Sequence, residues 1–284
     1  MAVKESLLRS FLVKEIPPPS TLEPYISKYY VYENLKESLP GYFFRALPNG
    51  MVELFFFVGG NRIVFREKQH EQRLSGFLAG VFKLDYPMKI KVENNVNQLK
   101  GLSVLFTHLG VNLLLGHKLY ELTNRIIGID RFRYQDVYRQ YMNISEIEDE
   151  RLLFENLNEF FLHQLRSKNY QTQKIVLLLN NLEHMKGLLT IDRITSEFGF
   201  SYKRLYRLFT DEMGMSPKMY LKILRFNRAC YLFDRASEKD IAEIVYKCGY
   251  YDQAHFQHEF KSIMNESPHS MRGKFYFNRP YALK

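Results

Sequence analysis

The C-terminal part of the chain contains one unit written twice, and this repeat limits the possible folds more than any other feature. Residues 191–200 read IDRITSEFGF and residues 241–250 read IAEIVYKCGY. Both copies have Ile at their first and fourth positions, Gly at the ninth and an aromatic residue at the tenth. The similarity continues to Ser216-Pro217 and Ser267-Pro268, with one additional residue in the turn of the second copy. Such self-similarity indicates a duplicated supersecondary unit.

Each copy has the pattern of two helices joined by a tight turn. The spacing of its two Ile residues gives the first helix one buried stripe. Gly199 or Gly249 can then end that helix in the left-handed conformation without a steric penalty from a Cβ atom. Ser201 and Asp252 offer side-chain oxygens that cap the start of the second helix. Ser216-Pro217 is a typical start for a further, long helix, which is predicted to join the two units.

The second helix of each copy places polar and aromatic side chains opposite its buried residues. Leu205, Leu208 and Phe209 are expected to face inward in the first copy, and Phe256 and Phe260 in the second. An outward face of Arg, Lys, Tyr, Gln and His, without acids near the helix start, suits the major groove of DNA. The candidate DNA-binding residues are Tyr202, Lys203, Tyr206, Arg207, Gln253, His255, Gln257 and His258.

This pattern resembles the DNA-binding domain of the AraC/XylS family. The resemblance spans residues 174–284 and rests on Gly199-Phe200-Ser201 and Gly214-Met215-Ser216-Pro217 in the first copy. In the second copy it rests on Gly249-Tyr250 and Ser267-Pro268. It implies a sequence-specific transcription regulator that reads two adjacent major grooves of double-stranded DNA with two recognition helices.

Three residues depart from the family pattern. Thr195 and Val245 stand where Ala is usual, and Asn265 replaces the usual Gly before Glu266. Each is larger or less flexible than the usual residue, so we expect local packing to differ. No DNA-facing position is lost.

The charge distribution agrees with a nucleic-acid partner. The chain of 284 residues has a formal net charge of +9. Residues 173–284 hold 18 Lys and Arg residues against 12 Asp and Glu residues, whereas residues 1–172 hold 22 against 19. The smaller part of the chain therefore carries most of the positive excess, as expected of a part that meets phosphates. Many proteins are equally basic, so charge supports the repeat and does not replace it.

The N-terminal part is rich in short aromatic and β-branched runs separated by turn residues, a texture typical of an antiparallel sandwich or barrel. Residues 1–23 are interpreted as an extended segment without a packing signal. The predicted strands span residues 25–32, 42–47, 51–58, 61–66, 77–84 and 99–107. The predicted helices that follow span residues 111–122, 132–142 and 147–165.

These observations predict an α+β chain of two domains. Residues 1–166 form a β-rich, cupin-like domain with trailing helices, followed by a linker at 167–173 and an all-α DNA-binding domain at 174–284. Through Leu47-Pro48-Asn49-Gly50 and the segment 101–125, the first domain resembles N-terminal domains of AraC-type regulators whose ligand is unassigned. That resemblance implies a sensing or dimerising module. The first helix of the second domain is expected to bury Ile175, Leu178, Leu179, Leu182 and Met185.

Some residues allow two interpretations. Glu53 could face a ligand inside a barrel, but strand alternation favours the solvent face. Arg225, on the long helix, could reach a phosphate or pair with an acid such as Asp234. His255 and His258 have a helical spacing that metal sites use, but we do not expect a carboxylate or Cys to complete a ligand set there. Base or phosphate contact is the preferred interpretation of both histidines.

Nothing in the chain indicates catalysis or a cofactor. The sequence has no Ser/His/Asp set, paired carboxylates at a glycine turn or phosphate-binding loop. Cys230 and Cys248 are too few for a disulfide framework or a zinc site, and we interpret Cys248 as a small packing residue. No apolar run reaches the length of a membrane helix, and no signal peptide is evident, which predicts a cytoplasmic protein.

The predicted partner is double-stranded DNA, and the further candidates are RNA polymerase, a small-molecule effector of unknown identity and a second copy of the chain. Two alternatives remain open at this point. One is a cupin-type enzyme fused to a DNA-binding module. The other is a ligand-independent DNA-binding protein whose N-terminal domain only dimerises.

Overall fold

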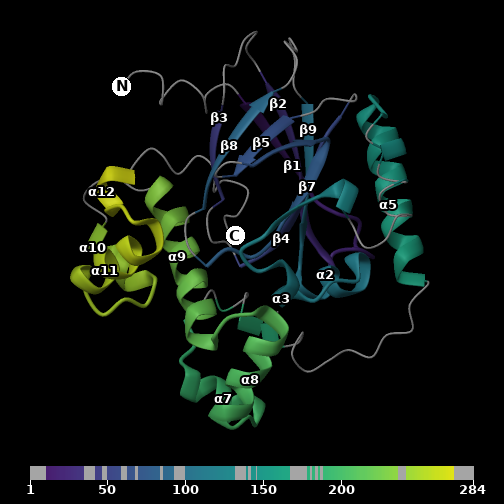
Figure 1. Cartoon of the computed structure of the whole chain (residues 1–284). Coiled ribbons are helices and arrows are strands. Elements are labelled where there is room, and N and C mark those ends of the chain that lie inside the picture. The colour runs from purple at the N-terminus through teal and green to yellow at the C-terminus, as the bar shows by residue number, and fades with distance from the viewer. Residues whose placement is uncertain are drawn as a thin grey trace.

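The computed structural model shows a β-rich N-terminal part and a helical C-terminal part (Figure 1). This confirms the α+β class, and the sheets, helices and contacts below are those of the described residues. The described residues are 11–34, 42–46, 50–58, 63–67, 70–83, 86–92, 100–131, 139, 142–144, 146–166, 178–179, 181–182, 185, 188–235 and 241–271.

The larger sheet has six strands, and each of its pairings is antiparallel. In spatial order the strands are β1 (Phe11–Ile16), β2 (Ile26–Asn34), β9 (Lys100–Phe106), β4 (Val52–Phe57), β7 (Gly76–Ala79) and β10 (Ile126–Gly128). The interpretation of residues 1–23 as lacking packing is wrong for β1. This strand pairs with β2 along its whole length, because its partner lies later in the chain and gives no local signal.

The second sheet has four antiparallel strands. Their order is β3 (Tyr42–Ala46), β8 (Tyr86–Val92), β5 (Ile63–Glu67) and β6 (His70–Leu74). Only Ser75 separates β6 from β7, so the chain passes directly from this sheet into the larger one. Two antiparallel sheets joined in this way form the β-rich domain expected of a cupin-like module.

Alternation along the strands gives the larger sheet two different buried faces. Tyr29 and Phe56 lie on the face that packs against helices, whereas Tyr30, Glu53 and Phe55 lie on the opposite face. Glu53 is only 9% exposed, so the preference for its solvent exposure is wrong. The error arises because that face is buried too, and its buried side chains include Tyr30 and Leu105.

Helices cover the other face of the larger sheet. They are α2 (His108–Leu115), α3 (Leu119–Leu122) and α5 (Glu150–Arg166), with a short 3-10 turn at Ile129–Arg131. The helix predicted over 111–122 is divided, because Gly116 adopts a left-handed conformation with φ 64° and ends α2. The predicted helix at 132–142 lies largely outside the described residues. On α5, Phe161 packs edge-on against Phe106 of β9 at 5.6 Å between ring centroids.

The C-terminal part contains the two predicted helical units. They comprise α7 (Ile191–Phe198) with α8 (Tyr202–Met213), and α10 (Ile241–Lys247) with α11 (Gln253–Met264). The long helix α9 (Pro217–Arg235) joins them, and α12 (Pro268–Met271) follows the second unit. The linker predicted at 167–173 lies outside the described residues. No described helix combines the length and the apolar character that crossing a bilayer requires.

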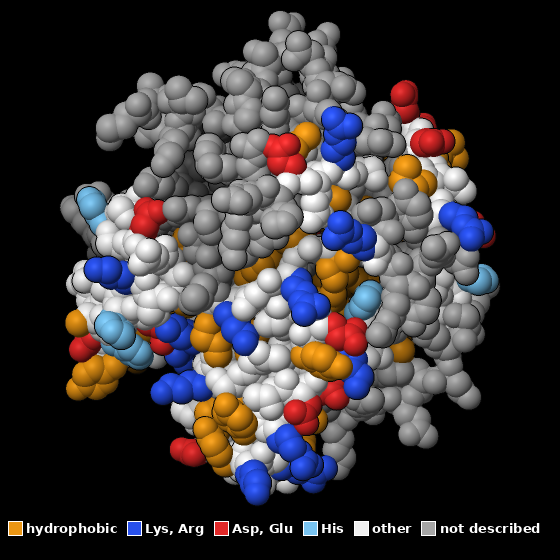
Figure 2. Space-filling view, in the orientation of Figure 1, with side chains coloured by type: hydrophobic (Ala, Val, Ile, Leu, Met, Phe, Trp, Pro, Cys, Tyr) orange, Lys and Arg blue, Asp and Glu red, His pale blue; other side chains and the backbone are white. Residues whose placement is uncertain are grey.

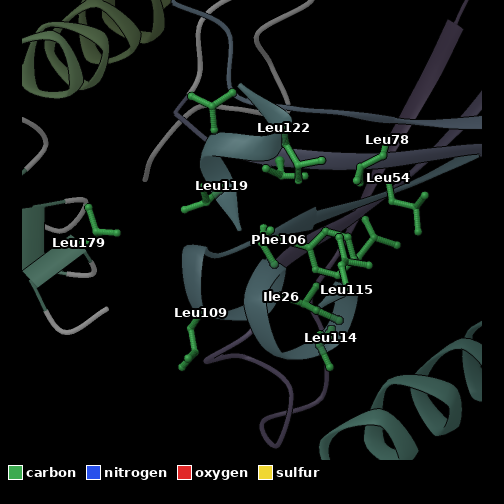
Figure 3. Packing of buried hydrophobic residues seen from close by; sticks show 14 of the residues in the cluster. Ile26, Leu54, Leu78, Phe106, Leu109, Leu114, Leu115, Leu119, Leu122 and Leu179 are labelled. Atoms are coloured by element: carbon green, nitrogen blue, oxygen red, sulfur yellow. The ribbon is translucent and has the colours of Figure 1, made fainter. Parts of the chain in front are cut away.

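The buried hydrophobic residues form two main clusters that do not follow the predicted domain boundary. One cluster runs from the strands through α2, α3 and α5 into the first helical unit and ends at Leu224. Figure 3 shows its part around Phe106 and Leu115. The other begins at Phe226 and belongs to the second unit. Leu178, Leu179 and Leu182 lie in the first cluster as predicted, but Met185 is 39% exposed, which corrects its assignment to the buried stripe.

Candidate nucleic-acid interface

The turn of the first unit has the geometry that its sequence predicts. Thr190 caps α7, and Gly199 ends it with a left-handed φ of 66°. Ser201 then caps α8, where its side-chain oxygen accepts a hydrogen bond of 3.3 Å from the backbone N–H of Arg204. These local bonds satisfy backbone groups that helix ends otherwise leave unpaired. The start of α8 is thereby fixed.

The second unit repeats this geometry with different residues. Gly249 has a φ of 74°, and Asp252 caps α11 by accepting a hydrogen bond of 2.7 Å from the backbone N–H of His255. At the end of α11, Asn265 takes the left-handed conformation that Gly214 takes after α8. Asn tolerates this conformation better than most side chains, so the departure from Gly is accommodated.

The outer face of α8 is an exposed aromatic and basic surface. Tyr202 and Tyr206 are 61% and 45% exposed, and their rings are stacked 6.4 Å apart. Lys203 and Arg207 are exposed on the same helix. Figure 2 shows hydrophobic side chains beside Lys and Arg side chains on the lobe that α7 and α8 form. Arg and Lys can meet phosphates and guanine edges, and Tyr hydroxyls commonly contact phosphates.

Arg204 belongs to this surface and was missed by the sequence interpretation. It is exposed, and its guanidinium carbon lies 5.3 Å from the centroid of the Phe200 ring. Contact with an aromatic face restricts an otherwise flexible side chain. The signal was present in the sequence, because Arg204 directly follows the assigned residues Tyr202 and Lys203 and directly precedes the buried Leu205.

The outer face of α11 is polar, whereas its inner face is apolar. Gln253, Gln257 and His258 are exposed, and Phe256 and Phe260 are each 1% exposed. Two further tyrosines, Tyr246 on α10 and Tyr251 in the turn, are 84% and 92% exposed. Tyr251 precedes the N-cap and was not assigned from the sequence.

His255 differs from the other assigned residues because both of its ring nitrogens face groups of the chain itself. The backbone N–H of Tyr251 donates to Nδ1 at 3.3 Å, and Nε2 lies 3.6 Å from the Glu259 carboxylate. The ring also packs edge-on against Tyr250 at 5.4 Å. These contacts orient His255 along the helix, and its contact with DNA stays a prediction.

Arg225 joins the connecting helix α9 to the second recognition helix. Its Nη2 atom donates to both carboxylate oxygens of Glu259, at 3.2 and 3.0 Å. The guanidinium also lies 5.8 Å from the centroid of the Tyr250 ring. Of the two interpretations left open, the structure shows pairing with an acid, although the acid is Glu259 and not Asp234.

Comparison with known proteins agrees with this geometry. Residues 194–274 match a sequence family described as a helix-turn-helix domain, and residues 14–128 match a domain of unknown function, DUF6597. The transcriptional activator RhaS of Escherichia coli O9:H4 is 27% identical over 194 residues, which cover 57% of this chain and 69% of RhaS. RhaS of strain SMS-3-5 is 34% identical over 100 residues, covering 35% of this chain and 36% of that protein.

The chain is a DNA-binding transcription regulator of the AraC/XylS type. Among solved structures, ToxT from Vibrio cholerae O395 aligns over 95% of the regulator and 98% of its own length, with a TM-score of 0.45 and 13% identity. RhaS, which aligns with the regulator in sequence, is a transcriptional activator of the helix-turn-helix type. The exposed faces of α8 and α11 are therefore the regulator's candidate DNA contacts, and their individual roles stay predictions.

The two cysteines of the regulator are packing residues. Cys230 and Cys248 are both buried in the cluster of the second unit, as the sequence predicts for Cys248. Burial raises the pKa of Cys248 to about 11, although the charge of Arg228 acts in the opposite direction. Within the described ranges, no three His, Cys, Asp or Glu side chains are grouped as a metal site would require.

Proposed function

We propose that the regulator reads two adjacent major grooves on one face of the DNA, with α8 in one groove and α11 in the next. The observation that carries this proposal is the pair of capped helices with exposed polar faces, both attached to α9. A helix presented in this way is how helix-turn-helix proteins enter the major groove. Neighbouring major grooves on one face lie about 34 Å apart, so one chain would span two turns.

Selection of bound sites from random DNA, followed by hydroxyl-radical footprinting of the full chain, tests this proposal. We expect two protected segments separated by about 10–10.5 base pairs. The variants Arg207→Ala and Gln253→Ala assign each segment to one helix, and Lys247→Ala on α10 serves as a control outside both recognition helices. A single protected segment per chain would mean that only one unit engages DNA.

We propose in addition that the N-terminal domain senses a small molecule or joins two copies of the chain, and that the regulator acts in the cytoplasm without catalysing a reaction. The family resemblance of this domain supports a sensing role. Sedimentation of the full chain and a melting screen with small molecules separate the two roles. A dimer whose melting temperature no compound changes would favour the ligand-independent alternative, whereas a compound that raises it would favour a sensor. Turnover of a small molecule would favour the cupin-type enzyme.

A further inference from the structure

The first DNA-binding unit is packed against the N-terminal domain, whereas the second has a core of its own. The large cluster includes Leu119 and Leu122 of α3 together with Leu205 and Phe209 of α8. Figure 3 shows part of this cluster, with Leu179 across from the side chains of the N-terminal domain. The separate cluster around α11 contains no residue of the N-terminal domain. The two recognition helices therefore have different structural supports.

Thr123 provides a direct polar connection between the domains. Its hydroxyl donates a hydrogen bond of 2.7 Å to the backbone carbonyl of Met213, the last residue of α8. The last carbonyls of a helix have no partner within the helix, so this bond satisfies one of them. The next residue is Gly214, where an added Cβ would lie 3.0 Å from Thr123 Oγ1. The absence of a side chain there permits the close approach.

Tyr220 provides a second connection, at the start of α9. Its hydroxyl lies 3.3 Å from Nε2 of His108, and their rings pack edge-on at 5.4 Å. The Tyr220 ring also packs against Phe209 of α8, with 5.7 Å between ring centroids. A Cβ added to Gly50 would lie 3.3 Å from the Tyr220 ring. Tyr220 thus lies between the N-terminal domain and the body of the first recognition helix.

These contacts are compatible with DNA binding. They involve the C-terminal end and the inner side of α8, through Met213 and Phe209. The assigned DNA-facing residues, such as Tyr202 and Arg207, are exposed on the outer side. The outer side of α8 is therefore exposed while the domains are in contact.

We propose that Thr123 and the His108–Tyr220 pair are positioning residues for the first recognition helix. The N-terminal domain sets the orientation of α8, whereas α11 is held within its own unit, by the core that it shares with α9 and α10 and by the Arg225–Glu259 pair. His108 follows β9 after a single residue, and Gly50 lies two residues before β4. A movement of these strands would therefore change the orientation of α8 and leave that of α11 unchanged. This inference rests on the proposed reading of two grooves. It explains how the N-terminal domain controls the reading of one groove, the one that α8 enters.

Hydrogen exchange on the full chain tests the positioning role without DNA. The variant Thr123→Val removes the hydroxyl, Thr123→Ser restores it, and Thr195→Val removes a hydroxyl of α7 that bonds only within its own helix. Because one hydrogen bond contributes about 0.5–1.5 kcal/mol, we expect Thr123→Val to speed exchange at residues 209–214 by about two- to thirteenfold. Residues 260–265 of α11 should not change, and Thr123→Ser and Thr195→Val should resemble the parent. Equal changes at both helices, or none, would overturn the proposal.

Footprinting on the selected DNA site then tests the consequence for binding. We expect Thr123→Val to weaken protection of the segment assigned to α8 by about two- to thirteenfold and to leave the α11 segment unchanged. Uniform weakening of both segments would overturn the positioning role. If the parent chain selects no DNA site, the proposed function fails, and hydrogen exchange still decides the role of Thr123. Should Thr123→Val not fold, Tyr220→Phe, which keeps the ring and removes only the hydroxyl, undergoes the same two measurements.

Discussion

Arg225 of α9 and Glu259 of α11 form an ion pair, with 3.0 Å between Nη2 and Oε2, in the second DNA-binding unit. The Glu259 side chain is 9% exposed and that of Arg225 is 20% exposed. In the repeat, the position of Glu259 corresponds to Leu208 of α8, which packs against the large core cluster. The two units therefore attach their recognition helices differently: both use apolar contacts, and the second adds a partly buried charge pair.

Removing Arg225 should destabilise the second unit strongly. In Arg225→Met, Glu259 would remain buried without its cationic partner, which we expect to lower the free energy of unfolding by about 3 kcal/mol. Urea denaturation followed by circular dichroism measures the change, and hydrogen exchange locates it in α11. As a control, the double variant Arg225→Met/Glu259→Leu replaces both charges and should recover most of the loss. Equal stability of the single and double variants would show that the isolated carboxylate carries no penalty.

The predicted domain boundary can be tested by limited proteolysis. We expect cleavage within residues 167–173 and a C-terminal fragment, residues 174–284, that remains folded and binds DNA. Because the fragment lacks the Thr123 and His108 contacts, its protection of the α8 segment should be weaker than that of the full chain, with the α11 segment retained. Footprinting of the purified fragment checks both points. A fragment that is unfolded, or inert on DNA that the full chain binds, would contradict the boundary.

The elements predicted well are those whose signals are local. Gly199, Ser201 and Asp252 determine where helices end and begin through bonds to residues at most a few positions away, and the repeat provides each signal twice. The apolar spacing of Phe256 and Phe260 predicts burial for the same reason. Helix geometry relates such positions without knowledge of the rest of the chain.

The features not predicted depend on contacts between distant parts of the chain. β1 is a strand because it pairs with β2, and Glu53 is buried on a face of the larger sheet that also buries Tyr30 of another strand. The hydrogen bond from Thr123 to Met213 spans 90 positions, and neither residue has a distinctive local pattern. His255 was assigned as an outward residue from helix spacing, which does not reveal that Glu259 and Tyr251 engage its ring.

Cys248 should respond slowly to thiol reagents and make the stability depend on pH only in the alkaline range. Its folded pKa of about 11 is above the ordinary value, so the folded state retains a proton that the unfolded state loses between about pH 9 and 11. The contribution of this thiol is fully present below pH 9 and decreases by up to about 1.4 kcal/mol per pH unit above it. Denaturation of the parent and of Cys248→Ala from pH 8 to 10.5 measures the difference. Identical pH dependence, or rapid alkylation of Cys248 in the folded chain, would contradict the burial argument.

Base reading can be distinguished from charge attraction with Arg207 and Gln253. The fork of Arg207 suits the O6 and N7 atoms of guanine, and the amide of Gln253 suits adenine. A bidentate base contact contributes about 1–3 kcal/mol of discrimination, so Arg207→Ala and Gln253→Ala should each lose preference at one base pair. The two affected positions should lie about one helical turn apart, with circular dichroism unchanged.

A panel of DNA sites with single-base changes measures this loss of preference, and Lys203→Ala provides the comparison. If Lys203 contacts only phosphate, its loss should weaken binding to every site alike and reduce the salt dependence by roughly one ion. The discriminating result is the pattern across the panel and not the size of the loss on the preferred site. Should Arg207→Ala and Gln253→Ala also weaken every site by one common factor, both residues anchor the phosphate backbone, and sequence is read by other residues of α8 and α11.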